Sequence, residues 1–486
     1  MIQAKKTITD NHSVVVIFNN TTTDATIKAA VPAHIAACIS AYKKAKKVKE
    51  NSCVIVPLKP DPKAPSLVMI NLGDTKDASV SRFRSLTASA VRSLKDVSCV
   101  QWVVVASVDD WEHHLGQVIA MANYSVPNQK SNKSKDAKKD NATKHWVVSL
   151  ANTALQSGLV VGQAVNKARD FANQPANVLT TKAFVTQIKA LFKGDKRYKV
   201  TVLEESDLKK KKMHALLGVG QGSQYPSYLV DITYSGAPVA SKGLKAPVGL
   251  VGKGVVFDTG GISIKPSRNM KEMKGDMGGA AAVVGAAWAA GALNLKRQVS
   301  FVVPIVENMV SKEAQRPGDV VVASNGTSIE ITNTDAEGRL ILADALVYTA
   351  KKKVACMLDI ATLTGASIIA LGPYAISVMG NNQQVVDQLL DHAKGYNEQC
   401  WQLPLFDAYK DLLKSDVADI LNANEGREAG TITAAKFLEQ FVGDTPWAHL
   451  DIASTMSVGS TKGDMVKGMT GAGTRALIAF MTQYSA

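Results

Sequence analysis

One short segment constrains this chain more than any other, and it reads Asn333-Thr334-Asp335-Ala336-Glu337-Gly338-Arg339-Leu340. A second segment upstream adds two carboxylates, Asp258 and Asp276, among glycines and apolar residues. It also contains two lysines, Lys253 and Lys265. Burying carboxylates is costly unless positive charge compensates them. The four acids therefore predict a pair of divalent cations, and the fold must bring the two segments together.

Asp335 and Glu337 follow an apolar run that ends at Ile331. We expect this pair at the end of a strand, where residues i and i+2 point to the same side. Open α/β sheets bind their ligands at such strand ends. Taken alone, the pair is explained equally well as the cap and first-turn charge of a helix. The glycine-flanked Asp258 and Asp276 favour the metal hypothesis.

Oxygen ligands without a nearby histidine suit Zn, Mn or Mg. Lys253 lies between two glycines and either neutralises the acids or binds a metal as a neutral amine. Deprotonating it at pH 7 costs about 4–5 kcal/mol, which a tightly held zinc ion, at about 10 kcal/mol, can offset. Lys265, in a turn before Pro266, can polarise a carbonyl, and Arg339 can hold an anion or the substrate.

The 486 residues predict two α/β domains. Residues 1–150 form the smaller N-terminal domain, with strands expected at 13–18, 53–57, 66–71 and 100–106. A linking helix lies within 151–175. Residues 176–486 form the larger catalytic domain, with strands at 248–252, 299–306 and 354–360 and helices at 278–292 and 337–351.

The chain has the composition of a soluble protein, with 46% apolar and 20% charged residues. It contains no apolar run of the roughly 18 residues that a membrane span needs, and its N-terminus has no apolar signal segment. Five scattered cysteines, none in CxxC spacing, indicate reduced thiols. We therefore expect a cytoplasmic protein without membrane contact.

The net charge of +14 allows nucleic-acid binding as an alternative function. The excess lies in lysine tracts without interleaved aromatic residues, which is more typical of solvated loops than of a base-stacking surface. The longest such stretch, 128–144, is expected to be a loop or insertion. A two-metal phosphoesterase would fit the carboxylates alone but not the surrounding motifs.

These segments resemble the leucine aminopeptidases, whose signature is the sequence from Asn333 to Leu340. The resemblance covers about residues 150–486 and includes the segments at 166–177, 217–223, 359–366, 430–435 and 447–453. It implies a two-domain α/β fold with a mixed central sheet, and a homohexamer. It also implies two metal ions per subunit (Zn or Mn, with Mg or Co as alternatives) and short peptides as substrates. Some bacterial relatives also bind DNA.

By the resemblance, the metal ligands are Lys253, Asp258, Asp276, Asp335 and Glu337, with Asp258 and Glu337 shared between the ions. Lys265 polarises the scissile carbonyl, and Arg339 holds a bicarbonate ion as general base. The enzyme would be a leucyl aminopeptidase that requires a free α-amine and prefers leucine and other apolar N-terminal residues. The substrate would contact Lys253, Asp258, Lys265, Met273, Asp276, Asn333, Asp335, Thr362, Leu363, Gly365, Ala453 and Met456.

Overall fold

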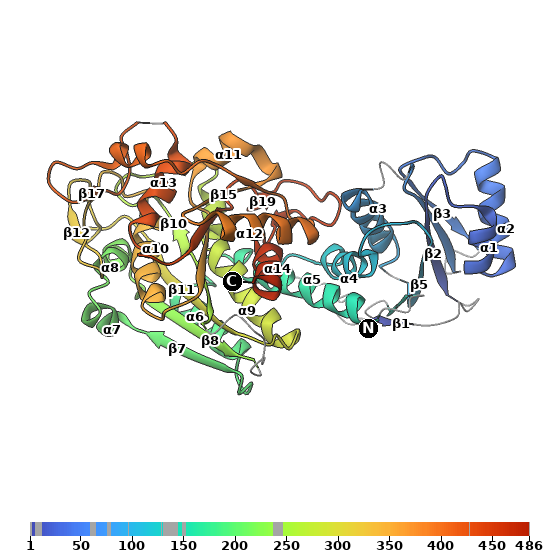
Figure 1. Cartoon of the computed structure of the whole chain (residues 1–486), viewed down its shortest axis with the longest axis horizontal. Helices are drawn as coiled ribbons and strands as arrows, with labels where there is room; N and C mark the ends of the chain where they lie inside the picture. The colour runs from blue at the N-terminus through green and yellow to red at the C-terminus, as the bar shows by residue number, and fades with distance from the viewer. Residues whose placement is uncertain are drawn as a thin grey trace. The chain divides into compact units, whose positions relative to one another are not determined.

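The computed structural model describes residues 2–4, 12–58, 65–74, 79–95, 97–127, 129, 144–147, 152–236, 246–426 and 428–485 (Figure 1). It divides into two compact units. The first comprises Met1–Gln163 with Gly459–Lys467, and the second comprises Ala164–Val458 with Gly468–Ala486. Most of the lysine-rich stretch at 128–144 lies outside the described residues. Because each unit is built on a mixed sheet with helices, the predicted α/β fold class is confirmed.

The first unit contains a six-stranded sheet in the order β1-β6-β5-β2-β4-β3. Side chains alternate between its faces: Val15 and Ile17 of β2 pack with α3 and α4, whereas Val14 and Val16 pack with α1 and α2 (Figure 1). The strands are β1 Ile2–Ala4, β2 Ser13–Phe18, β3 Ser52–Pro57, β4 Ser66–Asn71, β5 Cys99–Val104 and β6 Lys144–Val147. The helices are α1 Asp24–Ala30, α2 Ala33–Lys44, α3 Val80–Ser93 and α4 Trp111–Ala122.

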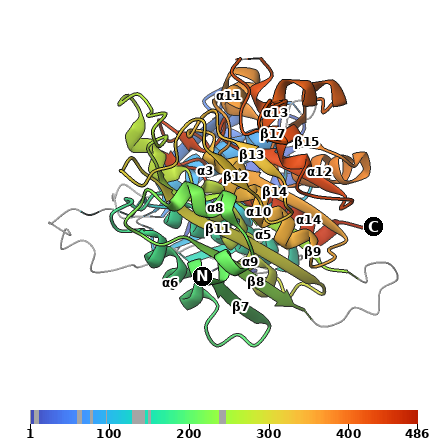
Figure 2. The same ribbon diagram turned by 90° about the vertical axis from the view of Figure 1, so that its left-hand side faces the viewer.

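The second unit contains a nine-stranded sheet in the order β16-β15-β18-β14-β9-β11-β8-β7, with β10 beside β11. Figure 2 labels β7, β8, β9, β11, β14 and β15 of this sheet. Strands β9, β11, β14 and β18 run parallel, and β8 and β15 pair antiparallel with β11 and β18. The predicted mixed central sheet is therefore confirmed. The strands are β7 Tyr198–Leu203, β8 Tyr228–Ser235, β9 Val248–Gly252, β10 Gly254–Asp258, β11 Gln298–Asn308, β14 Cys356–Ala361, β15 Ile376–Gly380, β16 Cys400–Gln402 and β18 Trp447–Asp451.

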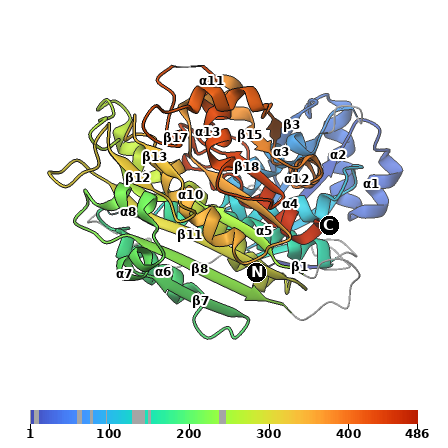
Figure 3. The same cartoon turned by 60° about the vertical axis from the view of Figure 1, so that its left-hand side comes forward.

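Helices cover both faces of this sheet (Figure 3). A side chain at Gly249 of β9 would meet Thr349 of α10, whereas one at Gly252 would meet Gly279 of α9, so the two helices lie on opposite faces. The helices are α5 Asn152–Ala172, which continues from the first unit, α6 Thr181–Leu191, α7 Glu205–Lys210, α8 His214–Gly220, α9 Gly278–Ala292, α10 Glu337–Ala350, α11 Gly365–Leu371, α12 Gln383–Gly395, α13 Gly430–Glu439 and α14 Thr474–Gln483. No helix in the described part of the chain combines the length and apolar character needed to cross a membrane.

Close packing of α9 against the sheet depends on Gly279. A Cβ atom there would lie 2.0 Å from the backbone oxygen of Ile360 in β14, which cannot move without displacing the strand. We expect Gly279→Ala to lower the free energy of unfolding by about 3 kcal/mol. Gly395→Ala is the matched control, because a Cβ at that position meets nothing within 4 Å. Thermal unfolding followed by circular dichroism measures both, and a wild-type melting temperature for Gly279→Ala would contradict this packing.

Candidate active site

The carboxyl ends of several strands of the second unit bring polar side chains to one edge of the sheet. Lys253 directly follows β9, and Asp258 is the last residue of β10. Thr362 follows β14, and Ala453 lies two residues beyond β18. Since β9, β11, β14 and β18 are parallel and β10 pairs parallel with β11, these ends share an edge. This is the usual location of ligand sites in open α/β sheets.

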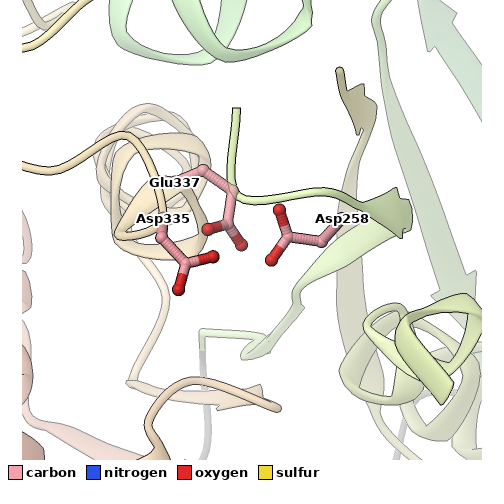
Figure 4. Close-up of side chains that lie close together, drawn as sticks. All are labelled: Asp258, Asp335 and Glu337. Carbon is pink, nitrogen blue, oxygen red and sulfur yellow. The ribbon is translucent and has the colours of Figure 1, made fainter. Parts of the chain in front are cut away.

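The prediction that Asp335 and Glu337 end a strand is wrong. The nearest strand, β13 (Ser328–Glu330), ends earlier and belongs to a small separate sheet with β12 (Val320–Val322) and β17 (Ile420–Leu421). Asp335 lies in a turn, and Glu337 is the first residue of α10. The two carboxylates nevertheless converge. With Asp258 they form a group whose ligand oxygens lie within 4.8 Å of one another (Figure 4).

The turn is shaped by the buried Asn422. Its side-chain oxygen accepts the backbone N–H of Thr332 at 2.9 Å, and its amide donates to the Asn333 carbonyl at 2.7 Å. The Asn422 carbonyl in turn accepts Nη1 of Arg339 at 2.8 Å. One residue thus fixes both the turn that contains Asp335 and the guanidinium beside it.

Two lysines pair with the four carboxylates. Lys253 Nζ lies 2.8 Å from Asp276 Oδ1 and 2.8 Å from Glu337 Oε1, and it donates to the Thr362 carbonyl at 2.8 Å. Lys265 Nζ lies 2.7 Å from Asp258 Oδ2 and also pairs with Asp335. The structure therefore brings together all five residues predicted as metal ligands, with Lys265.

The electrostatics of this cluster show an excess of negative charge. Burial, with repulsion from Glu337, raises the pKa of Asp335 to about 6 and also raises the pKa of Asp258. Burial raises the pKa of Asp276 well above its usual range. For Lys253, burial acts to lower the pKa, but attraction to Asp276 and Glu337 outweighs it and the pKa is raised. Each carboxylate would be stabilised by further positive charge nearby.

These residues fit a dinuclear metal site. Four carboxylates face only two ammonium groups, and Asp276 Oδ2 is buried without a hydrogen-bond partner in the described part of the chain. Two divalent ions would balance the four negative charges and leave Lys253 able to bind as a neutral amine. The residues that would hold the ions are Lys253, Asp258, Asp276, Asp335 and Glu337.

The cluster lies in a cavity of about 480 Å³. All the residues predicted for catalysis and for metal or substrate binding line it, including Arg339, Met273, Asn333, Leu363, Gly365 and Met456. Arg339 is buried, its Nε has no hydrogen-bond partner among the described residues, and burial lowers its pKa to about 10.

Other residues of the cavity were not predicted. Arg268, Asn269 and Met270 line the cavity and lie in the sequence between Lys265 and Met273, two predicted site residues. That position could have indicated them as residues of the site. Thr364 lies within the segment 359–366, Ile368 lies two residues beyond it, and Gly430 begins the segment 430–435. No role in the site was predicted for these three residues. Asn422, by contrast, has no local feature in the sequence that distinguishes it.

The fold and the site define the class of α/β proteins with a carboxylate-rich centre for divalent ions. Residues 166–478 match the catalytic domain of the cytosol aminopeptidase family. The chain therefore belongs to the cytosol aminopeptidase family, which confirms the resemblance to the leucine aminopeptidases found in the sequence.

Individual relatives agree with this assignment. A probable cytosol aminopeptidase of Geobacter sp. (strain M21) is 47% identical over 332 residues, which are 68% of this chain and 66% of that protein. This match thus spans about two thirds of that relative's length. A probable cytosol aminopeptidase of Nitrosococcus oceani is 36% identical over 450 residues, covering 90% of this chain and 87% of the relative.

A solved structure is similar over almost the whole chain. The bottromycin maturation enzyme BotP, in complex with Mn, superposes with a TM-score of 0.84 at 30% sequence identity. The match covers 97% of this chain and 99% of that one. The two-domain α/β fold is therefore shared with a structure in which manganese is bound.

The role of Asn422 can be tested by its removal. In Asn422→Ala the Thr332 N–H and the Asn333 carbonyl lose partners in two part-buried hydrogen bonds, and each lost bond costs about 0.5–1.5 kcal/mol. We expect a lower melting temperature and weaker metal binding, because the turn that contains Asp335 is no longer fixed. Asn325→Ala is the control, since Asn325 is exposed and its side chain accepts a local bond from the Thr327 N–H. Equal metal affinity in the two variants, measured by calorimetry, would contradict this role.

Proposed function

We propose that the protein is a metal-dependent aminopeptidase that removes leucine and other apolar residues from the N-termini of short peptides. One observation carries the proposal. Four carboxylates and Lys253, all able to serve as metal ligands, converge in a cavity that also contains methionine and other apolar residues. Membership of the cytosol aminopeptidase family supports it.

Two divalent ions would be held by the five residues of the cluster, with Asp258 and Glu337 shared. Zinc or manganese is proposed, with magnesium or cobalt as alternatives, and the manganese bound to BotP supports this range. When bound, such ions supply Lewis-acid chemistry: they lower the pKa of a water molecule and stabilise the charge that develops on the carbonyl oxygen.

The protein's own residues complete the chemistry. Asp276 binds the free α-amine of the substrate, and its buried unpartnered Oδ2 supports this role. Lys265, in the same cavity, donates from Nζ to the scissile carbonyl oxygen. Arg339 would hold a bicarbonate ion, which would supply a general base. The unpartnered Arg339 Nε supports this, because a buried donor needs an acceptor.

The proposed preference for apolar residues rests on the lining of the cavity. Met273 and Met456 present flexible thioethers, which adapt to unbranched and branched apolar side chains. Both are partly buried, so they can form the wall of a pocket. The other residues proposed to contact the substrate are Lys253, Asp258, Lys265, Asp276, Asn333, Asp335, Thr362, Leu363, Gly365 and Ala453.

A panel of aminoacyl anilides tests this function. We expect manganese-loaded protein to hydrolyse the leucine and methionine anilides with kcat/KM values at least about tenfold above those of the aspartate and lysine anilides, since an apolar pocket disfavours charged side chains. A phosphate monoester serves as the control for the phosphoesterase alternative. Hydrolysis of the phosphate ester without release of any anilide would overturn the proposal.

Similarity to the cytosol aminopeptidase family is the basis for proposing the cellular location, the oligomeric state and the domain limits of this protein. We propose a cytoplasmic homohexamer, with an N-terminal domain at 1–150, a linking helix within 151–175 and a catalytic domain at 176–486. The name of the relatives, cytosol aminopeptidase, supports the location. Light scattering on the purified protein measures the assembly, and a monomeric mass would contradict the hexamer.

A further inference from the structure

The cavity contains one positive charge that the proposed chemistry does not use. Four basic side chains line it: Lys253, Lys265, Arg268 and Arg339. The two lysines pair with the carboxylates, and Arg339 is buried. Arg268 is exposed, and within the described ranges its guanidinium makes neither an ion pair nor a hydrogen bond. It is therefore free to bind an anion that enters the cavity.

We infer that Arg268 binds the C-terminal carboxylate of the substrate, so that very short peptides with a free carboxyl end are the preferred substrate class. The inference rests on the proposed function. A guanidinium presents paired N–H donors in the geometry that a carboxylate accepts. In a peptide with apolar side chains, the C-terminal carboxylate is also the one anionic group that such a cavity would receive.

The position of Arg268 in the loop supports this assignment. It lies three residues beyond Lys265, which is proposed to contact the scissile carbonyl. Asn269, in the left-handed region at φ 67°, then begins the 3-10 helix Met270–Gly275, which leads to Asp276. Along the chain, Arg268 thus lies between the carbonyl-polarising lysine and the residue proposed to bind the α-amine, in a segment whose Pro266, Asn269, Met270 and Met273 also line the cavity.

Cavity size limits how long such a substrate can be. A volume of about 480 Å³ lies in the lower half of the roughly 300–1,000 Å³ typical of small-molecule sites. Each added residue moves the C-terminal carboxylate by at most about 3.6 Å. The carboxylate of a dipeptide or tripeptide therefore stays near the cavity, whereas that of a longer peptide is carried beyond it.

Charge balance favours the same ligand. With two divalent ions compensating the four carboxylates, Lys253 neutral and bicarbonate compensating Arg339, the cavity would keep the positive charges of Lys265 and Arg268. A cavity lined by one sign of charge raises the local concentration of oppositely charged ligands. An uncharged C-terminus, such as an amide or an anilide, would gain nothing from this field.

The test is the binding of an analogue of Leu-Gly in which a methylene replaces the scissile carbonyl, so that it cannot be hydrolysed. The analogue is prepared as the free acid and as the C-terminal amide, and calorimetry is performed on manganese-loaded protein. We expect the acid to bind the wild type about tenfold more tightly than the amide. This factor is at the lower end of the range for a charge-assisted hydrogen bond, because Arg268 is exposed. Arg268→Gln should remove this difference.

Lys271→Gln is the matched control, because Lys271 is an exposed cation of the same segment that does not line the cavity. It should retain the tenfold preference for the acid. Equal affinities of acid and amide in the wild type would overturn the inference, as would a preference that survives in Arg268→Gln.

Hydrolysis of Leu-Gly itself separates this inference from the proposed function. In Arg268→Gln we expect KM for Leu-Gly to rise about tenfold with kcat unchanged, and the amide of Leu-Gly to be unaffected, because the contact is made equally in the ground and transition states. If the analogue discriminates as expected but no peptide or anilide is hydrolysed, the proposed function fails and carboxylate recognition by Arg268 stands.

Discussion

Replacement of Glu337 by glutamine is expected to lower kcat/KM for a leucine anilide by a factor of about 10³ or more. Glu337 is buried at the start of α10, and its Oε1 lies 2.8 Å from Lys253 Nζ, at the centre of the cluster. Glutamine keeps the shape of the side chain but removes a negative charge that both proposed metal ions would share. Metal ions contribute several kcal/mol to transition-state stabilisation, which corresponds to this factor.

Metal content distinguishes the loss of a ligand from a general disturbance of the fold. Glu337→Gln should bind fewer than two ions per chain by elemental analysis, while its far-ultraviolet circular dichroism matches the wild type. Glu313→Gln is the control, because Glu313 is exposed and, among the residues that the structure describes, its carboxylate pairs only with the exposed Lys312. Full activity of Glu337→Gln with two bound ions would exclude Glu337 as a shared ligand.

Replacement of Lys265 by alanine is expected to lower kcat by about 10²–10³-fold, the usual cost of removing one donor to a developing oxyanion. Its Nζ lies 2.7 Å from Asp258 Oδ2 and also pairs with Asp335, so it is positioned beside the proposed ions. KM should change less than kcat, because the carbonyl oxygen carries more charge in the transition state than in the bound substrate.

The control for Lys265→Ala is Lys271→Gln, which removes an exposed cation from the same segment without altering the cavity. Steady-state kinetics with the leucine anilide give kcat and KM for both variants. A rise in KM alone for Lys265→Ala would show that this lysine only binds the substrate.

Much of the fold could be predicted from local patterns. The apolar run at 248–252 and the small-residue segment at 278–292 become β9 and α9, because burial on both sides leaves a continuous apolar signal. Strand β8 was not predicted. Its Asp231 is buried, and the compensating charge comes from Lys352, whose Nζ lies 2.6 Å from Asp231 Oδ1. A strand that buries an acid against a distant lysine lacks the local pattern of a buried strand.

The residues of the candidate site could also be predicted from the sequence. Four acids in an apolar background require compensation, and this condition is visible without coordinates. The local structure that brings Asp335 and Glu337 to the centre could not be predicted, because a turn held by Asn422 takes the place of the expected strand end. Asn422 acts through its position in space, far along the chain from the turn that it holds, and spacing along the chain does not encode such a contact.

Two divalent ions at the carboxylate cluster are proposed to make this protein an aminopeptidase. The most direct test is the cleavage of leucine anilide and of its N-acetyl analogue by chelator-stripped protein, before and after addition of manganese or zinc. We expect no cleavage without metal, recovery as two ions bind per chain, and cleavage of the free-amine substrate alone. Cleavage by stripped protein, cleavage of the acetylated substrate, or no cleavage by folded protein loaded with either metal would contradict this proposal.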